Sequence, residues 1–229
     1  MFQLKPLVLS ALLASAVGAS QAATVTLTKL TGLTGGSAAG TAVYKADLSS
    51  IGLATILSLG ISDNSSGLGG AAGQFSGFDL DAIKLSTTDC ADAACAAAAT
   101  PLALFDFGAG THFMPGVQRA PADPKLFGTD AAGTALDDAV ARLALFDGEN
   151  SVFTPGGFLS LGDNGAISFD LTAGASTTGL FLYIGEVGDN GEVAAGSIRV
   201  DDRRTVAEPS VAALLGLALF SAGWARRRR

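Results

Sequence analysis

Apolar and polar residues alternate with a period of two along most of the chain between residues 25 and 200. This period is typical of half-buried β-strands. Glycine-rich turns separate the alternating segments, as in antiparallel β folds. The pattern predicts a mainly β domain, an antiparallel β-sandwich or jelly-roll-like fold. The predicted strands are residues 25–30, 43–48, 55–61, 75–85, 102–107, 158–161, 166–171, 179–186 and 196–200.

Two segments interrupt the alternation. Residues 108–133 contain three prolines and are predicted to form a long loop. Residues 134–143 carry three apolar side chains at helical spacing, and Thr134 is positioned to cap a helix there. We therefore expect one short helix in an otherwise β domain.

The first 22 residues have the three parts of a secretory signal peptide. Lys5 supplies a positive charge, residues 7–17 are largely apolar, and Ser20 and Ala22 are the small residues that a signal peptidase reads. We expect cleavage between Ala22 and Ala23 after passage through the Sec translocon. The alternative, a buried N-terminal helix, gives no reason for such a cleavage site.

The chain ends with an apolar run, residues 211–225, followed by four arginines. A helix of this length spans about 22 Å, less than a hydrocarbon core of about 30 Å, but flanking arginine side chains extend a short span. Under the positive-inside rule the arginines stay in the cytoplasm, so both ends of the chain predict the same topology. The alternatives are a permanent single-pass anchor and a nucleic-acid-binding basic tail. The arginines are Arg226, Arg227, Arg228 and Arg229.

Glu208 and Pro209, the apolar helix and the arginine cluster together resemble the PEP-CTERM sorting signal of exported bacterial proteins. The resemblance covers residues 206–229 only, and Ala207 stands where that signal usually has its first proline. It implies that an exosortase removes the tail near Glu208 and Pro209. The chain then divides into a signal peptide (1–22), a β-sandwich domain (23–204) and a sorting signal (205–229).

The net charge of the body, residues 23–206, limits the kinds of partner that it can bind. The body holds nine of the chain's 14 Lys and Arg residues and 20 of its 21 Asp and Glu residues, which gives a formal charge of −11. So acidic a domain repels nucleic acid and anionic membrane surfaces. It is compatible with cations, neutral polysaccharide or a basic partner.

Cys90 and Cys95 are the only cysteines. In an exported protein so close a pair predicts a disulfide. A metal or redox pair is the alternative, but the spacing differs from redox motifs and no histidine lies nearby.

Calcium is the one cofactor that the sequence brings into consideration. Gly-Asp-Asn-Gly occurs at residues 162–165 and again at 188–191. The simplest interpretation is a hairpin turn, because Asn-Gly between apolar runs is typical of such turns. Aspartate oxygens in tight turns also suit Ca²⁺, although no segment matches an EF-hand. Asp79 and Asp81 alternate along a predicted strand, so their carboxylates should face one side of it. The weak candidate ligands are Asp63, Asp79, Asp81, Asp163 and Asp189.

No catalytic motif is present. His112 is the only histidine, and a serine hydrolase elbow is absent. The glycine-rich segment 67–73 lacks the ending of a phosphate-binding loop. An aspartate pair for glycoside hydrolysis is a separate possibility, although Trp224, the only tryptophan, lies in the tail.

These features predict a non-enzymatic, structural or adhesive protein of the cell envelope or extracellular matrix. It would pass the inner membrane of a Gram-negative-type bacterium and reach the outer surface or the matrix. Association with exopolysaccharide is implied by the PEP-CTERM resemblance alone. The alternatives are a secreted polysaccharide hydrolase that uses an aspartate pair and a calcium-dependent, lectin-like binding module.

Overall fold

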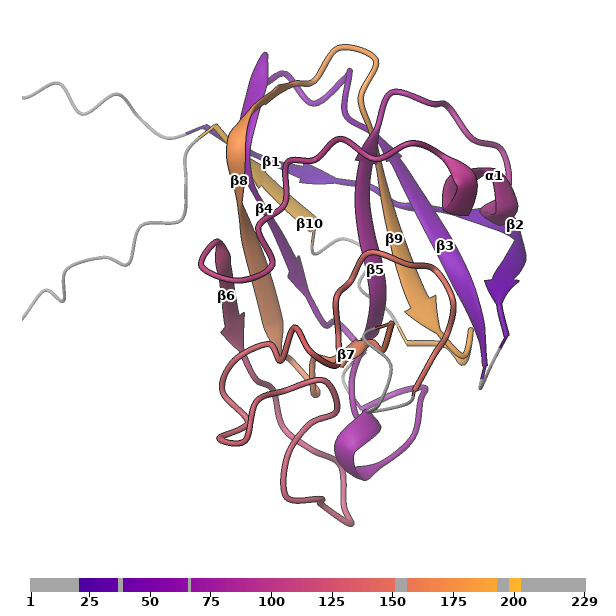
Figure 1. Cartoon of the computed structure of the whole chain (residues 1–229), viewed down its shortest axis with the longest axis vertical. Coiled ribbons are helices and arrows are strands. Elements are labelled where there is room, and N and C mark those ends of the chain that lie inside the picture. The colour runs from indigo at the N-terminus through magenta and orange to yellow at the C-terminus, as the bar shows by residue number, and fades with distance from the viewer. Residues whose placement is uncertain (1–20, 37–38, 66, 151–155, 193–197, 203–229) are drawn as a thin grey trace, which may run out of the picture.

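A computed structural model describes residues 21–36, 39–65, 67–150, 156–192 and 198–202. Two five-stranded antiparallel sheets pack face to face in it (Figure 1). This confirms the predicted mainly β fold. The predicted signal peptide up to Ser20 and the predicted sorting signal lie outside the described residues.

The first sheet has the strand order β1-β10-β4-β8-β6. The central pair β4–β8 has a register shift between Ile56 and Ser58, so a bulge bends the middle of the sheet. The strands are β1 (Ala22–Val25), β10 (Ile198–Asp201), β4 (Thr55–Ser62), β8 (Ala166–Ser176) and β6 (Thr111–Met114).

The second sheet has the order β2-β3-β9-β5-β7. Its central strands β9 and β5 pair with a register shift between Leu80 and Ile83. The strands are β2 (Thr28–Gly35), β3 (Gly40–Asp47), β9 (Phe181–Val187), β5 (Asp79–Ser86) and β7 (Leu159–Ser160).

The main hydrophobic core lies between the sheets. Ile56, Leu59 and Ile61 of β4 and Phe169 of β8 are almost completely buried and meet the apolar side chains of the second sheet. These strands alternate as the sequence predicted, because one face of each packs on the opposite sheet while the other does not.

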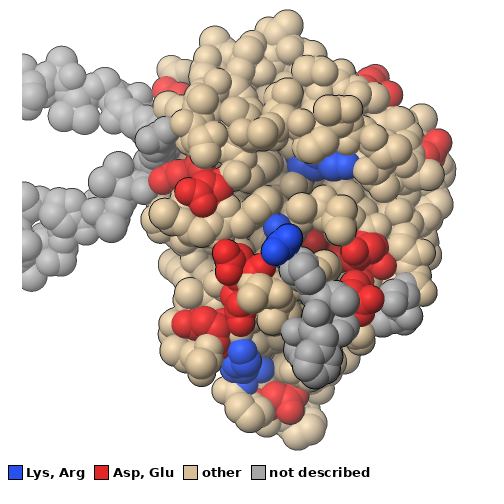
Figure 2. Space-filling model, viewed as in Figure 1, with Lys and Arg blue, Asp and Glu red and all other residues tan. Residues whose placement is uncertain are grey.

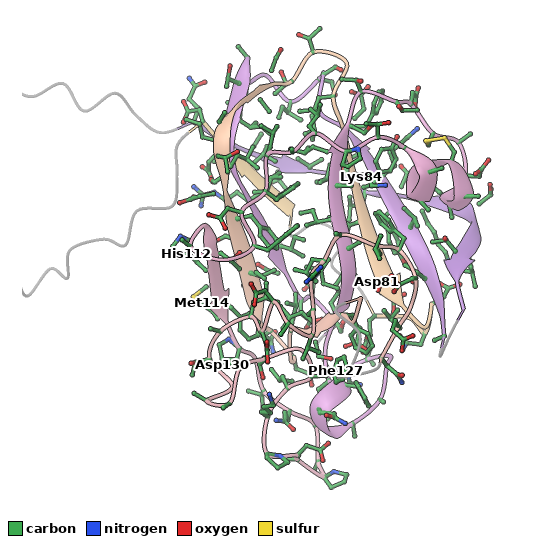
Figure 3. All side chains as sticks on the ribbon, in the orientation of Figure 1. Asp81, Lys84, His112, Met114, Phe127 and Asp130 are labelled. Atoms are coloured by element: carbon green, nitrogen blue, oxygen red, sulfur yellow. A yellow bond between two sulfur atoms is a disulfide. The ribbon has the colours of Figure 1, made fainter. Side chains whose placement is uncertain are left out.

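The outer face of the second sheet is covered by α1 (Ala93–Ala98). The Asp92 side chain caps this helix by accepting from the Cys95 amide at 2.7 Å, and a disulfide joins Cys90 to Cys95. The predicted disulfide is thereby confirmed. At the other end of the helix, the Lys84 ammonium donates to three carbonyl oxygens at 2.8–3.0 Å (Figure 3). Those oxygens belong to Ala96, Ala97 and Ala99.

The single short helix was expected at the wrong place. Within the described residues α1 is the only α-helix, while residues 134–143 form turns and isolated bridges. The Asp137 carboxylate accepts from the Ala139 amide, and Leu143 has a left-handed φ of 54°, so both favour a turn over a helix. The alanine-rich segment after the Asp92 cap forms a helix more readily than residues 134–143, because alanine has the highest helix propensity.

The predicted loop 108–133 contains β6 and continues well past residue 133. The segment between β6 and β7 covers the end of the sandwich drawn lowest in Figure 1. There the short 3-10 helix η1 (Gly73–Phe75) brings Phe75 against Phe127 and Phe158, with ring centroids 5.4 and 5.8 Å away. A small second apolar cluster closes this end.

Both Gly-Asp-Asn-Gly segments are turns, but neither closes a hairpin. The first lies between β7 and β8, and the second follows β9; in each case the next strand belongs to the other sheet. Asn164 and Asp189 have left-handed φ angles of 62° and 47°, which agrees with the predicted turn chemistry. The local signal for the turn was right, whereas the pairing of the strands depends on distant contacts.

The two ends of the described body lie side by side. β1 pairs with β10, and Ala22 is the partner of Asp201. Beyond that pair, the Asp202 amide donates to the Gln21 carbonyl at 3.2 Å. No helix among the described residues is long and apolar enough to cross a membrane.

Candidate functional site

An open groove of about 690 Å³ lies beside β8. Its walls come from the segment before β6, from the turn at 138–144 and from β8 itself. The side chains that give it chemical character are Phe105, Asp106, Phe107, Asp138, Arg142 and Thr172.

One wall of the groove is formed by two stacked phenylalanine rings. The rings of Phe105 and Phe107 stack with centroids 5.5 Å apart and planes 6° apart. Both rings meet the edge of the buried Phe169, at 5.6 and 5.8 Å. The alternation of Phe-Asp-Phe places the two rings on one side and Asp106 on the other. This wall is therefore a rigid apolar surface with a carboxylate at its rim.

Backbone hydrogen bonds fix this wall to β8. The Thr172 amide donates to the Leu104 carbonyl at 2.8 Å, and the Asp170 amide donates to the Gly110 carbonyl at 2.7 Å. Phe105 forms an isolated bridge with Leu171. Of the predicted strand 102–107, only a single β-bridge forms. The backbone hydrogen bonds still hold this segment against β8.

The opposite wall is the turn 138–144. It is anchored by Ala141 and Leu143, both buried in the core, and the Ile83 amide donates to the Leu143 carbonyl at 3.0 Å. Asp138 and Arg142 are exposed on this turn. Neither forms an ion pair or a hydrogen bond with another described residue, so their charged groups are free to contact a ligand.

A group of charged side chains lies at the lower end of the sandwich, around Arg119. The Arg119 guanidinium lies 3.3 Å from the Asp163 carboxylate and 3.2 Å from the Glu192 carboxylate. It also donates to the Gly69 carbonyl. One cation thus ties three segments together: the glycine-rich segment 67–73, the first Gly-Asp-Asn-Gly turn and the end of the second.

Three carboxyl groups that interact with one another at this end are almost completely buried: Asp79, Glu186 and Glu192. Burial, reinforced by repulsion from Glu192 and Asp189, raises the pKa of Glu186 to about 8. Burial also raises the pKa of Glu192 to about 7, against the opposing effect of Arg119. Burial and Glu192 raise the pKa of Asp79 well above its usual range, although the Ser160 hydroxyl donates to it. At neutral pH this group therefore retains protons.

Asp63, Asp79 and Asp163 all border the Arg119 cluster, but the five calcium candidates are not grouped as metal ligands among the described residues. Asp81 accepts from the Thr41 hydroxyl at 2.6 Å and from the Gly148 amide at 3.1 Å, and burial raises its pKa to about 7. Asp189 pairs with Lys29. Asp79 and Asp163 have the partners given above. Asp79 and Asp81 are both buried, whereas the alternation predicted carboxylates on the open side of a strand.

The fifth calcium candidate, Asp63, forms hydrogen bonds with neighbouring protein groups. Its carboxylate accepts from the Ser65 hydroxyl at 2.5 Å and from the amides of Phe78 and Asn164 at 3.0 and 2.9 Å. Within the part of the chain that the structure describes, no three Asp, Glu, His or Cys residues are grouped to hold a metal ion.

The other residues that the sequence analysis discussed lie at the edges of the sandwich or outside the described residues. His112 lies on the edge strand β6, 3.5 Å from the Asp170 carboxylate and outside the groove (Figure 3). Ala22 and Ala23, the predicted signal cleavage site, are the first two residues of β1. The predicted sorting residues Glu208, Pro209 and Arg226 to Arg229 lie outside the described residues.

Sequence reasoning missed the groove. Its only local signal was Phe105-Asp106-Phe107, which was interpreted as a strand. The other wall is more than 30 residues away in the sequence, so nothing local indicated that the two meet. Comparisons of the chain with protein-family models, with curated proteins and with solved structures find no match.

Proposed function

We propose that this chain is an exported, non-enzymatic adhesive protein of a bacterial envelope or matrix, which holds a polysaccharide segment in the groove beside β8. The observation that carries the proposal is the composition of that groove. It combines the rigid Phe105–Phe107 surface with the exposed polar groups of Asp106, Asp138 and Arg142. Apolar ring faces suit the C–H faces of a sugar, and carboxylate and guanidinium groups suit its hydroxyls.

The charge of the molecule supports a neutral ligand. Acidic side chains gather on the lower half of the face shown in Figure 2, with few basic ones among them. The body as a whole is strongly acidic. Such a field repels polyanions at a distance, so a neutral glycan is favoured over nucleic acid or a highly anionic polymer.

The arrangement of the chain ends supports export with processing at both ends. β1 and β10 are neighbours, so the proposed leader and the proposed sorting tail start from one corner of the sandwich. Cleavage between Ala22 and Ala23 would leave three of the four residues of β1 in place. Removal of the tail near Glu208 would leave β10 whole. Signal peptidase and exosortase are the partners that this route requires.

The test is binding of the full chain to a glycan array and to neutral polysaccharides, followed by titration of the best ligand. Phe107→Ala should weaken binding about fivefold, since an aromatic contact surface contributes on the order of 1 kcal/mol. Arg142→Gln should weaken it by a similar factor. Met114→Ala and Arg199→Gln, which change exposed side chains outside the groove, should leave binding unchanged.

A turnover assay on the same ligands separates this proposal from the hydrolase that uses an aspartate pair. The groove contains two carboxylates, Asp106 and Asp138. A general acid needs a raised pKa, and the carboxyls with raised pKa values named above are buried away from the groove. We expect binding without product release. Product release that Asp106→Asn or Asp138→Asn abolishes would replace our proposal with the hydrolase.

A further inference from the structure

The glycine-rich segment 67–73 covers the buried carboxyl group at the lower end of the sandwich. Gly69 and Gly70 both have positive φ angles, 71° and 57°. A Cβ on Gly70 would overlap the Glu192 carboxyl, and a Cβ on Gly69 would lie 2.6 Å from the Glu192 amide nitrogen. Only glycine allows the segment to approach Glu192 this closely.

Arg119 is the one cation in direct contact with this group among the described residues. It pairs with Glu192 and Asp163 and reaches the Gly69 carbonyl. The loop that carries it is itself held down, because the Arg119 amide donates to the Ser76 hydroxyl at 2.8 Å and the Gly73 amide donates to the Arg119 carbonyl at 2.9 Å.

The cluster around Arg119 contains more acidic side chains than basic ones. Asp163 and Glu192 share a single guanidinium, and Asp79 and Glu186 lie close enough to Glu192 to be repelled by it. A second cation, Lys29 on β2, pairs with Asp189 and also attracts the Glu186 carboxylate. Among the described residues, neither side-chain oxygen of Glu186 has a hydrogen bond of normal geometry, although the Asp189 amide faces this carboxyl group. The other ionisable groups that face the cluster are Asp63 at the end of β4 and Tyr44 on β3.

An ionised carboxylate without a partner is costly in such a position, whereas a protonated one is not. Glu186 is the Cα partner of Leu80 on β5 and of Ala42 on β3, so it lies in the middle of the second sheet and cannot turn to solvent. When Glu186 ionises, its loop partners must separate from it instead. Those partners are the turn at 188–192 and the segment 67–73.

We propose that Asp79, Glu186 and Glu192 form a proton-operated latch at this end of the sandwich. When they hold their protons, the latch keeps segment 67–73 and the 188–192 turn against the strands. When the protons leave in alkaline solution, repulsion among the carboxylates releases both segments while the two sheets stay paired. The latch makes this end of the protein responsive to the pH of its surroundings.

Hydrogen exchange of the full chain, kept in mild detergent and measured by mass spectrometry at pH 6 and pH 9, tests the latch. After correction for intrinsic exchange, amides in 67–73 and 188–192 should exchange about tenfold faster or more at pH 9, as expected when a pKa lies a unit or more below the working pH. Amides of β4 and β8 should not change. Equal corrected rates at both pH values would overturn the proposal.

Two variants identify the groups. Glu186→Gln is neutral at both pH values and should remove most of the pH dependence in the two segments. Asp89→Asn changes an exposed carboxylate outside both the groove and the buried cluster and should behave as the unaltered chain. Full pH dependence in Glu186→Gln would contradict the latch. If that variant does not fold, infrared titration of carboxyls in the unaltered chain decides: a glutamate that titrates near the Glu186 pKa of about 8 supports the latch, and titration of every carboxyl below pH 6 rejects it.

Discussion

The guanidinium of Arg119 lies 3.2 Å from the buried Glu192 carboxylate and 3.3 Å from Asp163. This contact connects loops that are 73 residues apart in the sequence and closes the lower end of the sandwich. Because the pair is buried, its partners depend on each other much more than a surface ion pair would.

Replacing Arg119 by methionine should therefore destabilise the fold strongly. The change leaves two buried carboxylates without a cation, and breaking a buried pair in this way costs about 3–5 kcal/mol. Urea unfolding at pH 7 should show the loss, and the loss should be smaller at pH 5, where Glu192 is protonated. Arg199→Met, at an exposed pair with Asp201, is the control and should change the free energy of unfolding little.

Stability should fall as the pH rises from about 5 to 8. The folded chain keeps a proton on Glu186 up to its pKa of about 8, whereas the unfolded chain releases that proton near the ordinary value of 4.5. Between these values the folded state binds more protons, so raising the pH favours unfolding. Glu192 and Asp79 act in the same direction. A melting temperature that is constant or rises over this range would contradict the assignment.

In stronger acid the trend should reverse. Backbone hydrogen bonds from Ser49 and Thr134 hold the pKa values of Asp47 and Asp130 below 3.8, so their contribution is lost as the pH falls through those lowered values. We therefore expect a melting temperature that is highest in mildly acidic solution. A scan of melting temperature from pH 3 to pH 9 shows both slopes in one experiment.

Lys84→Met should loosen α1 without unfolding the sandwich. The Lys84 ammonium satisfies three carbonyl oxygens at the end of the helix and lies 5.1 Å from the centroid of the Phe146 ring. Methionine keeps the apolar stem but loses these bonds, at a cost of about 2 kcal/mol. Faster hydrogen exchange in residues 93–99, with unchanged exchange in β4, is the expected result. Equal loss throughout the protein would show that the ammonium supports more than the helix.

Removing the disulfide should have a moderate effect. Replacement of Cys90 and Cys95 by alanine opens a very short loop, which costs about 2 kcal/mol in the chain-entropy account. The Tyr183 hydroxyl still connects this segment to β9, because it donates to the Thr88 carbonyl at 2.6 Å and accepts from the residue-90 amide at 2.9 Å. Chemical denaturation should show a lower midpoint with an unchanged slope. A change in the slope would mean that the native state itself has altered.

Much of the fold could be predicted from local sequence, since strands such as β4 and β8 alternate cleanly between a buried and a less buried face. β6 was missed because Thr111 to Met114 lie among glycines and prolines, where only pairing with β8 makes them a strand. Asp79 and Asp81 resemble the polar positions of a half-exposed strand. They are buried because distant segments cover that side of β5, and a local pattern cannot indicate this.

The order of the strands was also beyond sequence reasoning. Turns such as Gly162 to Gly165 were recognised from their chemistry, but whether the next strand joins the same sheet depends on contacts between segments far apart in the chain. The groove and the carboxyl cluster have the same origin, since each forms where segments distant in sequence meet.

Intact-mass spectrometry of the protein recovered from outside producing cells, together with binding of that material to a neutral glycan, tests the central claim most directly. We predict a mature chain that begins at Ala23, lacks the arginine cluster and binds in the groove, so that Phe107→Ala weakens binding. An untrimmed chain confined to the cytosol would contradict export. A trimmed, exported chain that binds glycan equally well with Phe107→Ala would contradict binding in the groove.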